Sequence, residues 1–516
     1  MSKILSTPGV YIEEKNAFPN SIVPVATAVP AFIGYTEKAI RDKKNLHNIP
    51  TRISSLAEYL LYFGEAPDTR YALTASGDKP LQFELSPKTE TRFLLYYSMK
   101  LFFANGGSDC YIVSIGNYNS KPVLADFNSE TVANGKLGLK GIATLQQEPE
   151  PSLLVIPDAM LLGEADRAAL QQSMLLHCEK MASRFCILDV FMDEKDTQKP
   201  DTQELVRDFR EQIGNENLSW GAAYYPWLHT NITDSSAVNF RNIDRGSWDQ
   251  LIALLLAEVD ENVSKGLNKN RADAIKTVIK SINDAAKEDA NGLDKAALSS
   301  DNTLHQTLLA ISPLYKSIMT AVLEKLNFLP PSAGLAGVYC MVDNQVGVFK
   351  APANLSLNSV IRPAVNITQE EQEDLNVPLN GKAVNAIRNF PGQGVLIWGA
   401  RTLDGNSPDW RYVSVRRTII YIEQSIKYAI KPYVFEPNDA NTWLTVKSMI
   451  SNFLTNVWQS GGLAGGTPAD AFGVNIGLGS TMTPVDILNG VMNITVTIAV
   501  TRPAEFMVIT LQQKMG

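Results

Sequence analysis

Two short apolar runs that flank an amphipathic helix constrain the fold of this chain more than any other feature. Residues 153–156 and 186–190 are predicted to be buried strands, with a helix over 165–181 between them. A strand, a helix and a strand in this order form a parallel βαβ unit. Residues 110–115 are predicted to be a further buried strand. The sequence therefore predicts an α/β domain over residues 34–400.

Within this domain, residues 235–328 have a different character. Apolar side chains recur there at helical spacing in three groups, with mixed charges between them. The groups are Trp248, Leu251, Ile252, Leu255 and Val259; Ile275, Val278, Ile279, Ile282 and Ala286; and Ile318, Met319, Val322, Leu323 and Leu326. We expect a helical insertion that forms an autonomous surface module.

Residues 401–504 are predicted to form a separate α+β domain. One helix should cover 415–430 and stop at Pro432, and a second should cover 439–458. Residues 492–500 alternate apolar and polar side chains, as a half-buried antiparallel strand does. The glycine-rich run 461–466 lacks the lysine of a phosphate-binding loop, so we interpret it as a helix cap and a turn.

Both ends of the chain are predicted to be extended arms, over residues 1–33 and 505–516. Pro24 and Pro30 argue against a central strand near the start, because proline is confined to edge or irregular strands. Residues 506–511 are apolar on both faces, and such a strand is an aggregation hazard unless it is buried. Addition to the sheet of a neighbouring copy would bury it, whereas the alternative is an ordinary final strand. The residues assigned to the arms are Val10, Tyr11, Ile12, Phe506, Met507, Val508, Ile509 and Leu511.

Composition argues against several classes of function. The net charge is -8 and no long basic run occurs, which disfavours binding to nucleic acid. No stretch of about 18 apolar residues is present, so direct membrane insertion is not expected. The start of the chain has no apolar run like that of a signal peptide, and the four cysteines show no CxxC spacing. We therefore expect a protein made in the cytoplasm without a signal peptide, with reduced cysteines.

Asp158 and His177 are the residues that could suggest an enzyme. Asp158 follows a predicted strand and His177 lies on the next helix, so an Asp–His–Ser hydrolase is conceivable. However, no serine lies in a G-x-S-x-G turn, and we expect Asp158 to cap a turn and Asp158→Ala to cost little stability. The group His177, Cys178 and Cys186 has irregular spacing for a metal site. No catalytic residue, metal or cofactor is predicted.

Nine segments in the same order along the chain resemble the phage tail sheath protein family. They are residues 7–14 (TPGVYIEE), 25–34 (VATAVPAFIG), 153–159 (LLVIPDA), 330–339 (PPSAGLAGVY), 384–403, 410–418 (WRYVSVRRT), 458–472, 483–490 (TPVDILNG) and 502–512 (RPAEFMVITLQ). Any one of these motifs is weak evidence, but the collinear set is specific. The helical insertion and the segments near 65–90 and 117–140 fall outside the resemblance.

This resemblance implies a structural subunit of a contractile tail or a contractile injection system. Such subunits form hexameric rings that stack helically around an inner tube, contract, and contact baseplate and terminal cap proteins. The arms should interlock neighbouring subunits, and the middle domain should be a subtilisin-like α/β fold without catalysis. The particle would be a phage tail or a phage-tail-like device. The alternatives are another tail or baseplate structural protein and, less favoured, an α/β hydrolase.

The resemblance also implies that the C-terminal domain lies innermost, against the tube. On the predicted helix 439–458, one face is polar but carries almost no charge, unlike a freely solvated helix face. We interpret this face as the tube contact, with packing inside the same subunit as the alternative. Its residues are Asn441, Thr445, Ser448, Asn452, Thr455 and Gln459, with Lys447 at the edge.

Overall fold

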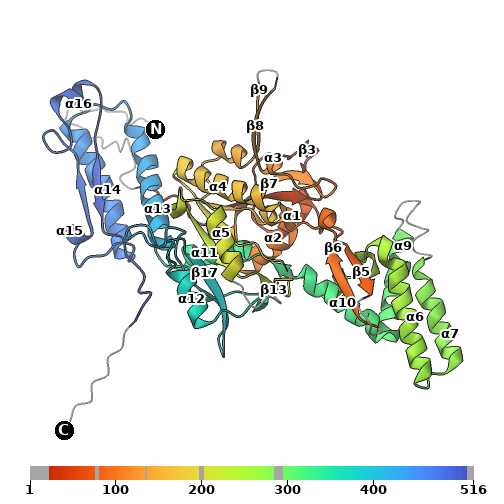
Figure 1. The fold of residues 1–516 in the computed structure, drawn as a ribbon. Coiled ribbons are helices and arrows are strands. Elements are labelled where there is room, and N and C mark those ends of the chain that lie inside the picture. The colour runs from red at the N-terminus through yellow and green to blue at the C-terminus, as the bar shows by residue number, and fades with distance from the viewer. Residues whose placement is uncertain are drawn as a thin grey trace, which may run out of the picture. The chain divides into compact units, whose positions relative to one another are not determined.

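The computed structural model describes residues 22–75, 81–133, 136–193, 195–196, 203–283 and 295–507 (Figure 1). The chain divides into two compact units. The larger unit is Thr27–Arg417, and the smaller unit combines Met1–Ala26 with Thr418–Gly516. Residues 401–417 thus belong with the α/β unit, although the sequence placed them in the C-terminal domain.

The larger unit is built on a nine-stranded sheet. In spatial order its strands are β15 (Leu355–Ser356), β18 (Gly394–Trp398), β17 (Val384–Phe390), β12 (Gly221–Tyr225), β11 (Phe185–Asp189), β10 (Leu153–Val155), β1 (Pro30–Thr36), β7 (Cys110–Asn117) and β4 (Thr51–Ile53). The strands from β17 to β7 are parallel, whereas β4, β18 and β15 run antiparallel to their neighbours. The predicted α/β class is confirmed for this unit.

Helices connect these strands and cover the sheet. They are α1 (Leu56–Phe63), α2 (Leu95–Ala104), α3 (Leu124–Phe127), α4 (Glu164–Met181), α5 (Gln203–Gln212), α11 (Ser332–Gln345) and α12 (Gln369–Asn376). Helix α4 joins β10 to β11, which confirms the predicted βαβ unit. Helices α2 and α11 pack closely on each other because Gly337 has no side chain: a Cβ there would lie 2.5 Å from the Phe102 carbonyl oxygen.

The prediction that residues up to 33 form an arm is wrong for residues 30–33. These residues begin β1, which lies between β10 and β7 and is buried along its whole length. Pro30 is the first residue of the strand, a position at which proline is tolerated. Proline therefore argued against a central strand only for positions inside a strand, and not for its first residue.

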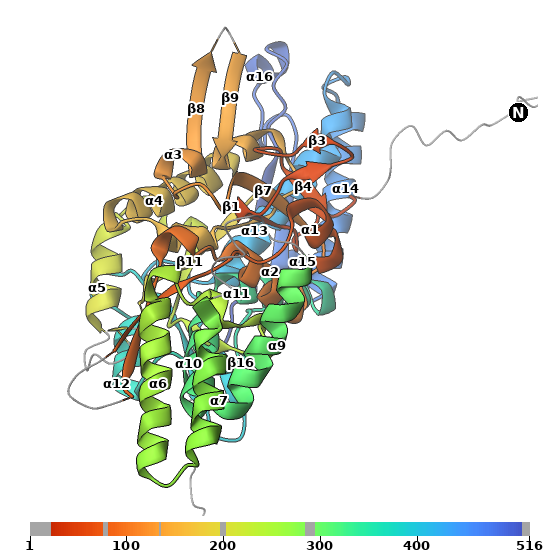
Figure 2. The ribbon, with the colours of Figure 1, turned by 90° about the vertical axis from the view of Figure 1, so that its right-hand side faces the viewer.

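The helical insertion is confirmed as helical. It contains α6 (Trp248–Ser264), α7 (Lys269–Lys280), α9 (Lys295–Ile311) and α10 (Pro313–Leu326), visible beside the sheet in Figures 1 and 2. It is not autonomous, because the hairpin of β5 (Tyr71–Ala75) and β6 (Phe83–Pro87) packs against it. Asp244 N–H donates to the Tyr71 carbonyl at 2.7 Å, and Leu73 N–H donates to Ser247 Oγ at 3.0 Å. Two segments far apart in the sequence thus form one module, which we call the outer module.

Smaller strands complete the larger unit. They are the hairpins β2 (Ile40–Arg41) with β3 (Lys44–Asn45) and β8 (Asn128–Ala133) with β9 (Lys136–Gly141), and the three-stranded sheet of β14 (Phe328–Leu329), β13 (Leu228–Thr230) and β16 (Val360–Pro363). The sequence did not predict any of these hairpins. Their strands are short or carry many polar residues, so their apolar pattern is weak.

The outer module should be removable only as a whole. The module consists of residues 71–87 and 234–326, and the residues that flank each segment lie close together. Lys88 N–H donates to the Arg70 carbonyl at 2.9 Å, and Asn327 Nδ2 donates to the Thr233 carbonyl at 2.9 Å. Replacing 71–87 and 234–326 with short Gly/Ser linkers is expected to give soluble protein that still unfolds cooperatively. Thermal unfolding and sedimentation measure this.

Replacing 234–326 alone serves as the contrast. That change would expose Tyr71 and Leu73 to solvent, whereas their side chains are 2% and 0% exposed in the intact chain. Exposing such side chains costs about 1.5–3 kcal/mol each. The single replacement should therefore aggregate or melt at lower temperature, and equal behaviour of the two variants would contradict the composite module.

Candidate functional site: an assembly interface

The smaller unit is organised around helix α14 (Ala440–Gln459). Its first turn is capped by Asp439, whose carboxylate accepts from the backbone N–H groups of Asn441 and Thr442 at 3.0 Å. It ends at Gln459, just before Gly461, where φ is +88°, and Gly462 N–H donates to the Val457 carbonyl at 2.9 Å. The predicted helix and its glycine cap are both confirmed.

One face of α14 builds the core of this unit. The buried residues are Val446, Met449, Ile450, Phe453, Leu454 and Val457, which pack with Ile22, Ile422 and Val474. Ile422 lies on α13 (Val413–Ile430), the other long helix predicted here. Trp443, at the start of the same face, is only half-buried.

The opposite face of α14 is accessible in the described part of the chain. Asn441, Thr445, Lys447, Ser448, Asn452 and Gln459 are exposed, and Thr455 is half-buried. Packing inside the same subunit, the alternative raised by the sequence, therefore does not cover them among the described residues. The structure adds Leu444, which is 67% exposed beside this polar face and which the sequence analysis did not include.

A small antiparallel sheet lies against α14. Its strands are β19 (Phe472–Asn475) and β20 (Thr495–Ile498), with Val474 opposite Val496. The alternating pattern predicted over 492–500 is confirmed in part, because the strand itself covers four residues. Within the described residues each of these strands pairs only with the other, and just past β20 a single bridge joins Leu463 to Val500. Each strand therefore has an outer edge that no other strand covers. Such an edge is a template for another strand.

The last described residues of the chain form no strand. Residues 501–507 carry no helix or strand, and Phe506 and Met507 are 70% and 83% exposed. The other arm residues, Val10, Tyr11, Ile12, Val508, Ile509 and Leu511, lie outside the described residues. Strand exchange by the arms stays a prediction.

Sequence analysis missed a second exposed apolar feature of this unit. Phe435 is 103% exposed and has φ of +74°, a backbone region that bulky residues rarely adopt. The turn that carries it is fixed, since Asn438 accepts from Trp443 Nε1 at 2.7 Å and donates to the Val491 carbonyl at 3.1 Å. Val485 and Leu488 on the short helix α16 (Pro484–Leu488) are also exposed. The sequence could not reveal the φ angle of Phe435 or the exposure of these side chains.

The two residues that suggested a hydrolase serve different structural purposes. The Asp158 carboxylate lies 0% exposed and accepts three backbone N–H groups: Tyr35 at 2.8 Å, Leu94 at 2.7 Å and Leu95 at 3.1 Å. It thereby caps helix α2 from outside the helix, rather than a turn as predicted. Burial raises the pKa of Asp158 to about 6, and the three donors oppose that shift.

His177 is held by a different group. Its Nε2 lies 2.7 Å from the Arg184 guanidinium, and burial together with this positive charge lowers the pKa of His177 to about 3. A guanidinium at this nitrogen occupies the position that a metal ion would need. Among the described residues, no three His, Cys, Asp or Glu side chains come together as metal ligands.

Asp189 repeats the arrangement of Asp158 at the end of the next strand. Its carboxylate accepts from Ser332 N–H at 2.8 Å and from Ser332 Oγ at 2.5 Å, at the start of α11. Burial raises the pKa of Asp189 to about 7. In many α/β proteins, residues at the ends of the strands bind ligands. Here the residues at two strand ends bind the N-termini of α2 and α11. In the sequence, the signal for both residues was an Asp near the end of an apolar run: Asp158 follows Pro157 after the run 153–156, and Asp189 is the next-to-last residue of the run 186–190.

No helix in the described ranges combines the length and apolar character that a bilayer crossing requires.

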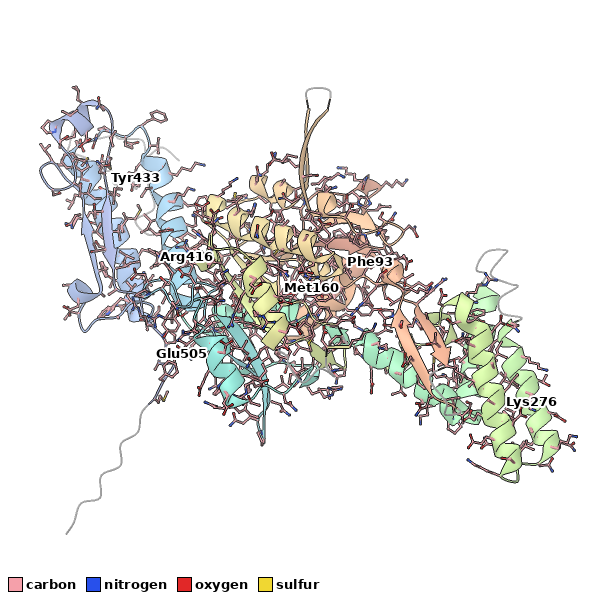
Figure 3. The ribbon with its side chains drawn as sticks, viewed as in Figure 1. Phe93, Met160, Lys276, Arg416, Tyr433 and Glu505 are labelled. Carbon is pink, nitrogen blue, oxygen red and sulfur yellow. The ribbon has the colours of Figure 1, made fainter. Side chains whose placement is uncertain are left out.

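Figure 3 shows the described side chains of both units. Two of its labels guide the eye: Met160 lies two residues after Asp158 in the sequence, and Tyr433 lies two residues before Phe435.

Comparisons with known proteins agree on one family. Residues 406–514 match the family model for the phage tail sheath C-terminal domain. The tail sheath protein of Vibrio phage KVP40 is 26% identical over 160 residues, and that of Salmonella phage ViI is 28% identical over 132 residues. These alignments cover 30% and 25% of this chain. They span only 23% and 20% of the phage proteins' own lengths.

Two solved structures match nearly the whole chain. One is the sheath complex of an extracellular contractile injection system, PVC, in the contracted state, with 26% identity, 99% coverage of both chains and a TM-score of 0.58. The other is the helical sheath of the anti-feeding prophage in the contracted state, with 26% identity, 99% coverage of this chain, 100% of that chain, and a TM-score of 0.58. Together with the family model and the phage relatives, these matches show that the chain is similar to tail sheath proteins and that its C-terminal region matches their C-terminal domain.

Proposed function

We propose that this protein is a sheath subunit that polymerises as stacked hexameric rings around an inner tube. Contraction of the polymer would drive the tube through a target envelope. The observation that carries the proposal is the two-stranded sheet β19–β20 with open outer edges, in a unit whose last described residues, Phe506 and Met507, are apolar and exposed. Similarity over 99% of the chain to two sheaths in the contracted state supports it.

The arms would join the subunits by strand addition. A donated strand gains backbone hydrogen bonds along an open edge and places alternate side chains on the apolar side of the sheet. Residues 506–511 and 10–12 have the length and composition for this role, and β19–β20 offers two edges to receive them. Each copy would then be linked to others by its own chain ends.

We further propose that the role is structural rather than enzymatic. Asp158 accepts hydrogen bonds from backbone N–H groups, and His177 contacts the Arg184 guanidinium, so neither is available for catalysis. A baseplate and a terminal cap would contact the two ends of the polymer. One sheath relative matched over its full length occurs in the anti-feeding prophage baseplate, which supports the baseplate as a partner. The particle would be a phage tail or a phage-tail-like device.

The tube contact would use the polar face of α14. Short neutral side chains lose little rotamer entropy when they are buried and avoid the desolvation cost of an ion. Such a contact can hold in the extended state and still release as the sheath widens. Leu444, exposed beside Ser448, adds apolar area to the same face.

Ser448→Glu with Asn452→Glu tests the tube contact. The double variant should fold and form empty contracted polymers, but it should no longer assemble extended on the tube, because two carboxylates would be buried without partners. The matched control is Asn302→Glu with Gln306→Glu, two exposed polar residues four apart on α9. Electron microscopy of co-expressed sheath and tube protein distinguishes the outcomes, and normal extended particles from the α14 variant would refute this contact.

Negative-stain electron microscopy of the purified protein tests the function as a whole. The proposal expects hollow tubes with regular helical striations. Monodisperse monomers at all protein concentrations, from a chain that is folded by circular dichroism, would refute it.

A further inference from the structure

Two chemically complementary surfaces lie at opposite ends of the nine-stranded sheet. One adjoins β4 and the other adjoins β18 and β15, which are the two edges of the sheet. Neighbouring strands are spaced about 4.8 Å apart, so the edges are separated by roughly 40 Å. Figures 1 and 2 both show β3 and α1 on one side of the larger unit and α12 on the other. The two surfaces therefore cannot meet within one copy.

The first, the basic edge surface, consists of Ile40, Arg41, Lys43, Lys44 and Leu61. The β2–β3 hairpin turns at Asp42 and Lys43, which both have positive φ, and it contacts helix α1. Ile40 and Leu61 are more than half exposed, and the Arg41 guanidinium lies 5.0 Å from the centre of the Tyr62 ring. Arg41, Lys43 and Lys44 are exposed together with Asp42, whose carboxylate lies 3.9 Å from the Arg41 guanidinium. The hairpin therefore keeps an excess of positive charge beside these apolar side chains.

The second, the acidic edge surface, consists of Glu370, Glu373, Val377, Leu379 and Trp398. Leu379 is 104% exposed, and Val377 and Trp398 are also exposed. Glu370 and Glu373 are exposed on α12, which is fastened to the sheet edge because Gln372 Nε2 donates to the Trp398 carbonyl at 2.9 Å. The Trp398 ring packs 4.5 Å from the Phe390 ring, so it is held in place. Ordered tryptophan side chains of this kind often dominate binding energy at interfaces.

We propose that the basic edge surface of one copy docks on the acidic edge surface of a second copy of this chain. An apolar centre with a charged rim is the usual anatomy of a protein interface, and here the rims carry opposite charges. Because the two surfaces differ, the contact is head-to-tail, and such contacts generate rings or helical filaments. The edge strand β15 has only two residues, so side chains rather than strand pairing would make the contact. The inference rests on the proposed function and adds a lateral contact between larger units, separate from the arms.

Charge reversal on each surface, alone and together, tests the proposal. The first variant is Lys43→Glu with Lys44→Glu, the second is Glu370→Lys with Glu373→Lys, and the third combines all four changes in the full-length chain. Each reversal alone sets like charges against each other and should raise the protein concentration at which polymer first sediments roughly tenfold at low salt. The combined variant should return to within about twofold of the original protein. Lys269→Glu with Arg271→Glu on the outer module makes the same charge change as the first variant and should have no effect.

Leu379→Asp provides a test that does not depend on charge pairing. It should reduce polymer as much as either reversal, whereas Leu176→Asp, at an exposed leucine on α4, should not. Unchanged polymer formation by the single reversals and by Leu379→Asp, or no recovery in the combined variant, would overturn the lateral contact. If the original protein forms striated tubes in those experiments, the proposed function survives that result. If it forms none, the proposed function itself fails.

Discussion

A chain that ends after Ala504 is expected to fold but to remain monomeric at concentrations where the intact protein is fully polymeric. The truncation removes the apolar run 506–511, whereas β19, β20 and the buried face of α14 are left complete. Phe506 and Met507 are exposed in the described chain, so their loss should leave the stability of the monomer nearly unchanged.

The expected effect on assembly is large because each donated strand would contribute several interactions at once. Burying one large apolar side chain contributes about 1.5–3 kcal/mol, and each backbone hydrogen bond contributes about 1 kcal/mol net. Losing a whole strand should therefore lower the affinity between copies by several orders of magnitude. Sedimentation velocity measures this, with a chain that ends after Gln512 as the control, because it keeps the apolar run and should polymerise normally. Normal polymer from the shorter chain would mean that residues 505–516 are not an arm.

Asp158→Ala is expected to destabilise the larger unit by about 4 kcal/mol or more. The substitution leaves the N–H groups of Tyr35, Leu94 and Leu95 without an acceptor, and each unsatisfied buried donor costs about 1–3 kcal/mol. This prediction exceeds the modest loss expected from the sequence, because at a turn on the surface water would have replaced the carboxylate. Denaturant unfolding at neutral pH measures the change.

The matched control for this substitution is Glu179→Ala, which removes an exposed carboxylate from α4. It should change the free energy of unfolding by less than about 0.5 kcal/mol. Asp158→Asn should also destabilise the protein, because one side of its amide would point N–H groups toward backbone N–H groups. If Asp158→Ala were as stable as the Glu179→Ala control, the capping role would be wrong.

The sequence predicted the parts of this fold that depend on strong apolar periodicity. The βαβ unit of β10, α4 and β11 and the helices α13 and α14 all carry long or purely apolar patterns, so local pattern and tertiary structure agree. The start of β1 was predicted to belong to an arm because it contains Pro30, although a sheet tolerates proline at a strand's first residue. The union of the β5–β6 hairpin with the helical insertion was invisible, because contacts between segments so far apart leave no periodic signal.

The candidate interface, too, could be predicted from the sequence only in part. The polar stripe of α14 follows from helical spacing, and its exposure agrees with the expectation that it is not part of the core. Leu444, Phe435 and Leu488 were missed because an exposed apolar residue looks like a core residue until the surrounding surface is known. The roles of Asp158 and Asp189 were missed as well, since the helix ends that they cap lie far away in sequence.

Helical reconstruction of the polymer by electron cryomicroscopy would show directly whether the arms exchange strands between copies. We expect β19–β20 to become a larger sheet in the polymer, with added strands formed by residues 506–511 and 10–12 of neighbouring copies. Finding residues 506–511 paired within their own subunit, with the outer edges of β19 and β20 still open, would contradict it.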